Sequence, residues 1–175
     1  SPTYSWSGPN SYSSTTAVNS AVFTPTATTA SGNYTLTVSY PGTGCTSAAV
    51  VTSPSVTVNA LPTVASISPS STTLCTGTAL TLTAGAVSGT GALTSYNWSG
   101  PNTYSAVTAS NSAVFTATTT AASGNYSVTV TYPGTGCTST AAVTSPSVTV
   151  NALPTIASIT PSSTTLCTGT ALTLT

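Results

Sequence analysis

Charged side chains are absent from this 175-residue sequence, which contains no Asp, Glu, Lys, Arg or His. A typical globular domain carries about a quarter of its residues as charged side chains. The groups that act as general acids and bases are therefore missing, so we expect no enzyme activity and no catalytic residue. Nucleic acid is not an expected partner either, because its binding depends on Lys and Arg contacts with phosphate.

Metal ions and membranes also fit this composition poorly. Calcium sites need carboxylates, and the four cysteines, at 45, 75, 137 and 167, lack the paired spacing of zinc ligands. No apolar run approaches the roughly 18 to 20 residues that span a bilayer, and the first residues do not resemble a secretory leader. We expect no metal, no cofactor and no membrane span, and a chain that is mature or internal to a longer one.

Hydroxyl side chains take the place of charge, with 43 Thr and 30 Ser among the 175 residues. Hydrophobic residues reach 39% and alternate with polar ones, which favours ordered β structure over disorder. A surface without charge lacks the repulsion that keeps particles apart. The expected partners are therefore copies of itself or adjacent modules in a fibre, or glycans that cover the hydroxyl-rich surface.

The sequence repeats with a period of 92 residues. Trp6 recurs at Trp98 and Cys45 at Cys137, and residues 1–83 match residues 93–175 without a gap at 65 of 83 positions. Residues 84–92 are left over between the two matching segments. Such close similarity between neighbouring units predicts a tandem array of recently duplicated modules.

Segments 53–63 and 145–155 each hold a proline suited to a short linker. Boundaries placed there give a partial module at 1–61 that lacks its first strands, a complete module at 62–152 and the opening strands of another at 153–175. Two interpretations remain open. The sequence is a window on a longer array, or the tail of one subunit completes the head of the next, as in strand donation.

The complete module has the pattern of a two-sheet antiparallel sandwich. Short alternating segments are separated by turn residues, and Pro133 to Gly136 form a strong hairpin signal. The expected strands are residues 64–68 and 72–75 (a first strand broken at Pro69), 79–83, 95–98, 103–107, 113–118, 125–132 and a long strand at 138–150. No helical periodicity accompanies them, so the predicted fold class is all-β.

Three sequence runs carry a resemblance to a known family: SSTTLCTGTALTLT, SGNYSVTVTYPGTGCTS and SVTVNALPT. They resemble the tandem immunoglobulin-like repeats of very large secreted surface proteins of Bacteroidetes, including gliding-motility adhesins. The pattern Gly77-x-x-Leu80-x-Leu82 is similar to immunoglobulin strand B, and Trp98 to the buried tryptophan of strand C. The resemblance implies an extracellular or cell-surface location and an adhesin or filament-type stalk.

The resemblance does not extend to the usual disulfide, because Ala84 and Val128 occupy the two cysteine positions of strands B and F. Three alternatives remain open for the pairing of the four cysteines that the chain contains. Cys75 pairs with Cys137 within a module, or each Cys75-type thiol pairs with the Cys137-type thiol of the following module, or the thiols are reduced. Oxidised cysteine in either form fits an extracellular location. If Cys75 pairs with Cys137 within a module, Cys45 and Cys167 are left to pair with neighbouring modules.

Aromatic residues complete the list of candidates. Trp6 and Trp98 are expected in the core rather than in a sugar-binding platform, and so are Tyr34 and Tyr126. By contrast, Tyr40 and Tyr132 precede the Pro-Gly hairpins and are expected at exposed contact tips.

The sequence therefore predicts a structural repeat module of a bacterial surface filament or adhesin stalk. The alternative is a module that binds a surface or carbohydrate through its hairpin tips. Asn33, Asn97 and Asn125 also begin N-x-[ST] glycosylation motifs.

Overall fold

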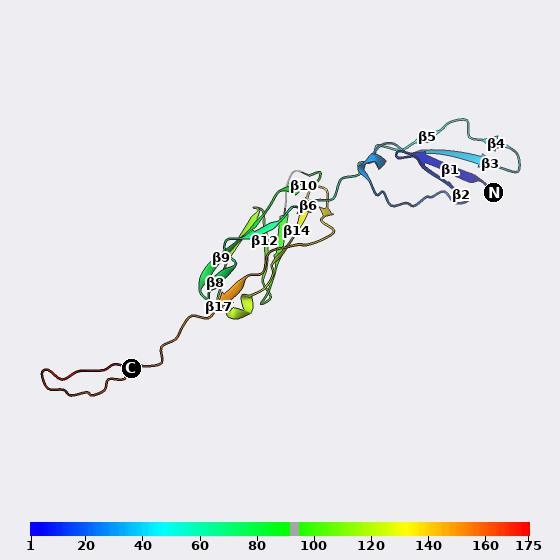
Figure 1. Cartoon of the computed structure of the whole chain (residues 1–175). Helices are drawn as coiled ribbons and strands as arrows, with labels where there is room; N and C mark the ends of the chain where they lie inside the picture. Colours follow the sequence, from blue (N-terminus) through cyan, green and yellow to red (C-terminus); the bar gives the residue numbers. More distant parts are fainter. Residues whose placement is uncertain (92–94) are drawn as a thin grey trace.

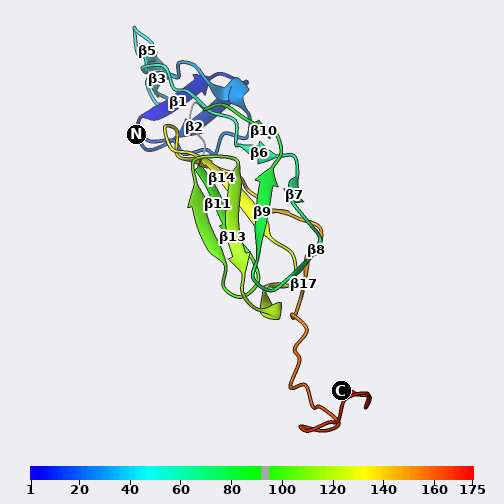
Figure 2. The same cartoon turned by 90° about the vertical axis from the view of Figure 1, so that its left-hand side faces the viewer.

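The computed structural model of the chain describes residues 1–91 and 95–175. Three parts follow one another along its length in Figures 1 and 2. They are the N-terminal sheet (β1 to β5), the central sandwich (β6 to β17) and the C-terminal segment (residues 152–175). Of the stretch 84–92 that separates the matching segments of sequence, Ala92 lies outside the described residues.

The N-terminal sheet is a single antiparallel layer with the strand order β2-β1-β3-β4, and β5 also pairs with β3. Its elements are β1 (Thr3–Gly8), β2 (Tyr12–Thr16), η1 (Thr28–Ala30, a 3-10 turn), β3 (Thr35–Tyr40), β4 (Cys45–Thr46) and β5 (Val51–Thr52). Trp6 lies opposite Leu36 and Tyr4 opposite Val38. Because opposed residues of an antiparallel pair share a face, these four side chains lie on one side of the sheet.

The central sandwich has two main sheets, with the orders β13-β9-β7 and β12-β11-β14-β15. A parallel pair, β17-β8, and the short pair β10-β6 complete it, and β16 also pairs with β14. Its elements are β6 (Thr63–Val64), β7 (Ile67–Pro69), β8 (Thr73–Cys75), β9 (Thr78–Ala84), β10 (Val87–Ser88), β11 (Ser95–Ser99), β12 (Ser105–Thr108), β13 (Ser112–Ala117), η2 (Thr120–Ala122, a 3-10 turn), β14 (Ser127–Tyr132), β15 (Cys137–Thr138), β16 (Val143–Thr144) and β17 (Thr149–Asn151).

The core lies between these two sheets and is built from alternate residues of their strands. Leu80, Leu82, Val128 and Val130 are fully buried, and Trp98 is 1% exposed. Thr and Ser occupy the intervening positions of β9 and β14, so hydroxyls face outward while Leu and Val fill the interior. Burial of this apolar surface is the main force that holds the sandwich together.

A hydrogen bond at the start of β14 identifies the type of sandwich. The hydroxyl of the buried Tyr126 donates to the backbone carbonyl of Ala122, four residues upstream, at 2.6 Å. This is the tyrosine corner of immunoglobulin-like domains, and Trp98 of β11 holds the position of their buried strand C tryptophan. The first strand is divided, since β7 pairs with β9 in one main sheet and β8 forms the separate parallel pair with β17. The fold is all-β and immunoglobulin-like, as the sequence predicts.

Two strand predictions were wrong in detail. The long strand expected at 138–150 is three short strands, β15, β16 and β17. After Thr138 the side chain of Ser139 accepts a hydrogen bond from the Val130 N–H at 3.1 Å, and the chain leaves the ladder until Val143. The first strand is interrupted at Pro69, which ends β7 opposite Leu82, but it has a second break, after Val64, that was not predicted.

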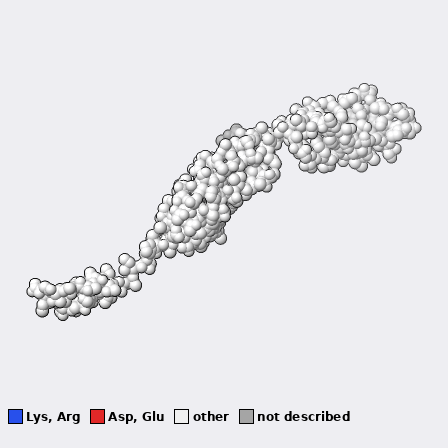
Figure 3. Space-filling model, in the orientation of Figure 1, with Lys and Arg blue, Asp and Glu red and all other residues white. Residues whose placement is uncertain are grey.

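The sequence contains no charged side chain, and no blue or red atom appears on the face drawn in Figure 3. Within the described residues, no helix has the length and apolar character needed to cross a bilayer.

Candidate functional site

The aromatic residues occupy equivalent places in the two folded units but differ in burial. Trp98 and Tyr126 are buried in the central sandwich, whereas Trp6 and Tyr34 of the N-terminal sheet are half-buried. Both indoles make the same bond: Nε1–H donates to Thr108 Oγ1 at 2.9 Å in Trp98 and to Thr16 Oγ1 at 3.1 Å in Trp6. These hydrogen bonds fix the indole rings and occupy their only polar group.

The two hairpin tyrosines differ, and the prediction of an exposed Tyr132 was wrong. Tyr40 is 54% exposed, but Tyr132 is 5% exposed. The loop that follows β10 covers the Tyr132 ring so closely that a Cβ added to Gly91 would lie 2.3 Å from its Cγ. This loop belongs to the stretch 84–92, which has no counterpart in residues 1–83. The comparison of the two repeats therefore did not predict that a loop covers Tyr132.

The two cysteines of the central sandwich, Cys75 and Cys137, lie at its opposite ends. Cys75 is opposite Asn151 at the end where the chain leaves the sandwich. Cys137 is opposite Tyr132, whose ring packs near Gly89 and Pro62 where the chain enters. Between these ends the β14 register runs from Tyr132 to Gly124, roughly 25 Å at about 3.3 Å per residue. A disulfide needs Cα atoms within about 7 Å, so this register is incompatible with a bond between Cys75 and Cys137.

All four thiols are free, and three of them are exposed. We therefore expect iodoacetamide to modify four cysteines per chain in the folded protein without added reductant. Mass spectrometry of the intact chain would count the adducts. A product with two adducts before reduction and four after it would contain an internal disulfide and would contradict four free thiols.

Two of the three glycosylation motifs have their acceptor nitrogen engaged. Asn125 Nδ2 donates to the Ser145 carbonyl at 2.7 Å, and Asn33 Nδ2 donates to the Ser53 carbonyl at 2.7 Å. Attachment of a glycan at either side chain would break a bond that ties the start of β14 or β3 to the neighbouring segment.

Burial raises the pKa of two core tyrosines, Tyr104 and Tyr126, above the ordinary value of 10.0. For Tyr126, proximity to Tyr104 adds a second, smaller upward contribution to the pKa. Because ionisation is harder in the folded state, these groups favour folding below about pH 10, and the contribution is lost as the pH rises further. Below that range no Asp, Glu, His, Lys or Arg is present to titrate.

We therefore expect a melting temperature that stays flat from roughly pH 3 to pH 8 and from low to molar salt, and that falls above about pH 10. Differential scanning calorimetry across this range is the measurement. A drop of many degrees at pH 3 would contradict the expectation, because no side chain changes its charge there.

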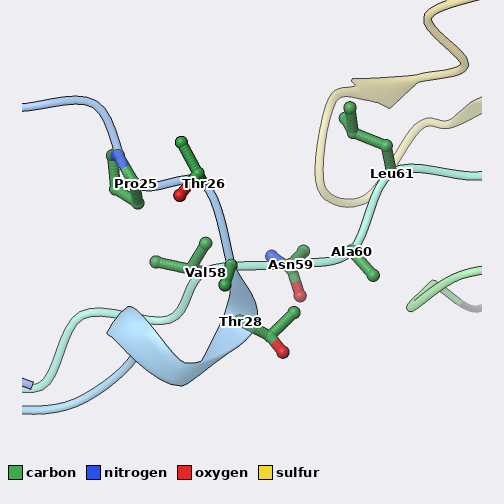
Figure 4. A pocket seen from close by; sticks show the side chains of 8 residues that line it. Pro25, Thr26, Thr28, Val58, Asn59, Ala60 and Leu61 are labelled. Atoms are coloured by element: carbon green, nitrogen blue, oxygen red, sulfur yellow. The ribbon is translucent and has the colours of Figure 1, made fainter. Parts of the chain in front are cut away.

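A groove of about 580 Å³ lies between residues 25–28 and 58–61 of the N-terminal unit. Figure 4 shows Pro25, Val58 and Leu61 among the side chains that line it. Phe23 and Val56, which precede its two walls in the sequence, are 38% and 44% exposed. None of the side chains that line the groove is titratable, so a ligand there would meet apolar surface and backbone groups only.

Within the described part of the chain, no three His, Cys, Asp or Glu residues gather in a potential metal site.

No protein-family model matches the chain, and no curated protein matches it. Among solved structures, the amphioxus IgVJ-C2 molecule is 15% identical with a TM-score of 0.40, over 85% of this chain and 88% of that one. The immunoglobulin domains 1–5 of Sidekick-1 are 16% identical with a TM-score of 0.40, over 87% and 33%. Three N-terminal domains of the bacteriophage RB49 Hoc protein are 19% identical with a TM-score of 0.42, over 85% and 48%.

This chain thus spans most of the first of these structures and less than half of the other two. The assignment of fold rests on the strand order, the buried tryptophan and the tyrosine corner described above. By that topology the chain is an all-β protein of immunoglobulin-like units.

Proposed function

We propose that this chain is a structural repeat segment of an extracellular bacterial surface filament or adhesin stalk. Its modules are residues 1–61, 62–152 and 153–175, and each complete module adds length to a stiff rod. The resemblance to repeats of secreted Bacteroidetes surface proteins supports this function and location. The absence of charged side chains supports a role without catalysis.

The observation that carries the proposal is the packed linker between the first two units. The Ala60 N–H donates to Thr90 Oγ1 at 2.8 Å, and Thr90 Oγ1 donates to Asn59 Oδ1 at 3.5 Å. Pro62 is fully buried, and Gly89 packs against it so closely that a Cβ added to Gly89 would lie 3.0 Å from the Cα of Pro62. A linker held by hydrogen bonds and packing transmits orientation, whereas an exposed one behaves as a flexible coil.

Disulfides between neighbouring modules are part of the same proposal. The Cys75-type thiol lies where a module ends and the Cys137-type thiol lies where a module begins. Successive modules of an array therefore bring these two ends together across the short linker. Such a bond would lock the joint in an oxidising extracellular environment.

The alternative, binding of carbohydrate through the hairpin tips, is less well supported. Tyr132 is 5% exposed because its own module covers it, so this hairpin tyrosine does not present its ring to a ligand. Carbohydrate pull-down with the intact chain separates the two functions: a spacer stays in the supernatant, and retention on a polysaccharide would favour the alternative.

The linker gives a direct test of the rod. Replacing Thr90 with alanine (Thr90→Ala) removes both linker hydrogen bonds, so we expect broader interdomain motion with a melting temperature that is nearly unchanged, as for most surface substitutions. Small-angle X-ray scattering of the whole chain measures the change as a broader distribution of distances. Thr118→Ala, at an exposed position away from the linker, is the matched control. Identical scattering for Thr90→Ala and the original protein would contradict a rigid joint.

A further inference from the structure

Strand β13 forms an open edge of the central sandwich. The order β13-β9-β7 places it at the end of its sheet, and its outer side has no neighbouring strand among the described residues. An unpaired strand edge presents a row of backbone N–H and C=O groups that can pair with another strand. The strand lies in the middle of the complete module, far in the sequence from either end of the chain.

The register with β9 shows which backbone groups of β13 are free. The Ala84 N–H donates to the Asn111 carbonyl at 2.8 Å, and these two residues continue the β9–β13 register by one position. Hydrogen-bonded and non-hydrogen-bonded pairs alternate along an antiparallel ladder. Counted from this bond, every second residue of β13 therefore points its N–H and C=O away from β9. These residues are Ser112, Val114 and Thr116.

These outward groups have few partners within the chain. Among the described residues, no backbone hydrogen bond beyond the β9 ladder involves Val114 or Thr116. The Ser112 carbonyl accepts one hydrogen bond, from the Ser110 hydroxyl at 3.3 Å, and keeps a second lone pair. Val114 is 65% exposed and Thr116 is exposed as well, so the centre of the edge is open to solvent.

The usual protection of an edge strand is missing from β13. Edge strands of soluble proteins are typically very short, interrupted by a bulge, or marked by a charged residue or a proline. By contrast, β13 pairs with β9 over six consecutive residues without a bulge, and its sequence SAVFTA contains neither proline nor a charged residue. The absence of charge from the whole chain also removes the repulsion that keeps two copies apart.

An apolar hollow lies beside the same edge. It has a volume of about 250 Å³, and its lining includes Tyr104, Phe115 and Thr116. The Phe115 ring stacks on the Tyr104 ring with centroids 4.1 Å apart, yet both residues are only half-buried. The edge therefore offers apolar surface beside its free backbone groups, and burial of such surface favours association.

We propose that β13 pairs with β13 of a second copy of this chain, in antiparallel orientation about a two-fold axis at Val114. In this register Val114 lies opposite its own equivalent, and Ser112 of each copy lies opposite Thr116 of the other. Each of these pairs points its backbone groups across the joint and exchanges two hydrogen bonds, so about six form in all. On the inner side Phe115 lies opposite the small Ala113, which leaves room for the ring.

A second copy fits this edge because the pairing is self-complementary. The same strand lies on both sides of the axis, so every outward-pointing group meets its match and the contact closes at two copies. The two β13-β9-β7 sheets then form one continuous sheet. In an array of complete modules each module would offer such an edge, and the contacts would reinforce one another between two antiparallel rods. That last step rests on the proposed repeat role, whereas the pairing of two chains does not.

Sedimentation velocity of the whole chain over a range of concentrations, with reductant present, is the first test. We expect the weight-average mass to rise with concentration. Val114→Lys should weaken this association about tenfold, because it removes an apolar cross-strand pair and places like charges opposite each other. The control is Val107→Lys in β12, a valine that is 69% exposed on the outer face of the other sheet, and it should associate like the original chain. Both variants should keep nearly the original melting temperature, because both valines are exposed.

A mixture of the Val114→Lys and Val114→Glu chains tests the position of the axis. The equimolar mixture should associate more tightly than either variant alone, because opposite charges then lie across the two-fold axis. A mixture no tighter than the separate variants would overturn the pairing at Val114. A chain that is monomeric at every concentration, or equal association of Val114→Lys and Val107→Lys, would overturn the use of β13. None of these results bears on the spacer role, which the scattering experiment on the linker tests.

Discussion

Replacing Trp98 with alanine (Trp98→Ala) is expected to lower the free energy of unfolding of the central sandwich by about 3 to 5 kcal/mol. The indole is 1% exposed, packs beside Tyr96 with ring centroids 6.3 Å apart, and donates to Thr108. Its removal leaves a cavity and also removes the hydrogen bond that the Thr108 hydroxyl accepts, although this hydroxyl still donates to the Ser110 carbonyl. Since small domains are stable by about 5 to 15 kcal/mol, a loss of this size removes much of the total.

The repeat supplies a matched control for this substitution. Trp6→Ala removes the same side chain and the same bond type from the half-buried position of the N-terminal sheet. We expect a clearly smaller loss, because much of the Trp6 ring already contacts solvent. Urea denaturation, monitored by far-ultraviolet circular dichroism, measures the free energy of unfolding of both variants. A larger effect for Trp6→Ala would mean that the central sandwich does not hold the main core.

Gly100→Ala is expected to destabilise the central sandwich by about 3 kcal/mol, at the upper end of the usual range for overpacking. A Cβ at this position would lie 2.3 Å from Tyr126 Cδ1 and 2.6 Å from its Cε1. The ring is fully buried and its hydroxyl is tied to the Ala122 carbonyl, so it has no room to move. Glycine is required here for close approach rather than for its backbone conformation.

Gly134→Ala is the control, because nothing lies within 4 Å of the added Cβ in the β14–β15 hairpin. We expect no loss there, and a small gain from reduced freedom of the unfolded chain. Thermal unfolding of both variants measures the difference as a change in melting temperature. Equal melting temperatures for Gly100→Ala and Gly134→Ala would show that Tyr126 is free to shift.

The sequence was enough to predict the sandwich because alternation and composition act locally. The pattern of Leu80 and Leu82 in β9, and of Val128 and Val130 in β14, assigns each side chain to a face without knowledge of its partner. Turn residues mark the hairpin at 133–136 in the same direct way. These features depend on neighbours a few residues apart, which a sequence displays.

Contacts between distant segments were not predictable in the same way. Tyr132 is covered by Gly89 and Gly91, which precede it by some 40 residues. No sequence pattern around these glycines predicts the contact. The division of the last strand depends on the hydroxyl of Ser139 competing for the Val130 N–H. The groove was also not predicted, since its two walls, residues 25–28 and 58–61, lie outside the strands and are about 30 residues apart in the sequence.

The parallel pair β8–β17 has a consequence for mechanical load. The chain enters the sandwich at β6, shortly before β8, and leaves it directly after β17. Tension on the two ends therefore pulls β8 and β17 in opposite directions along their own axes. The pairs Thr73–Thr149, Leu74–Val150 and Cys75–Asn151 are then loaded in shear and must yield together rather than one after another. A filament made of such units would resist stretching through these short ladders, and its lifetime under force would follow the rate at which they rupture.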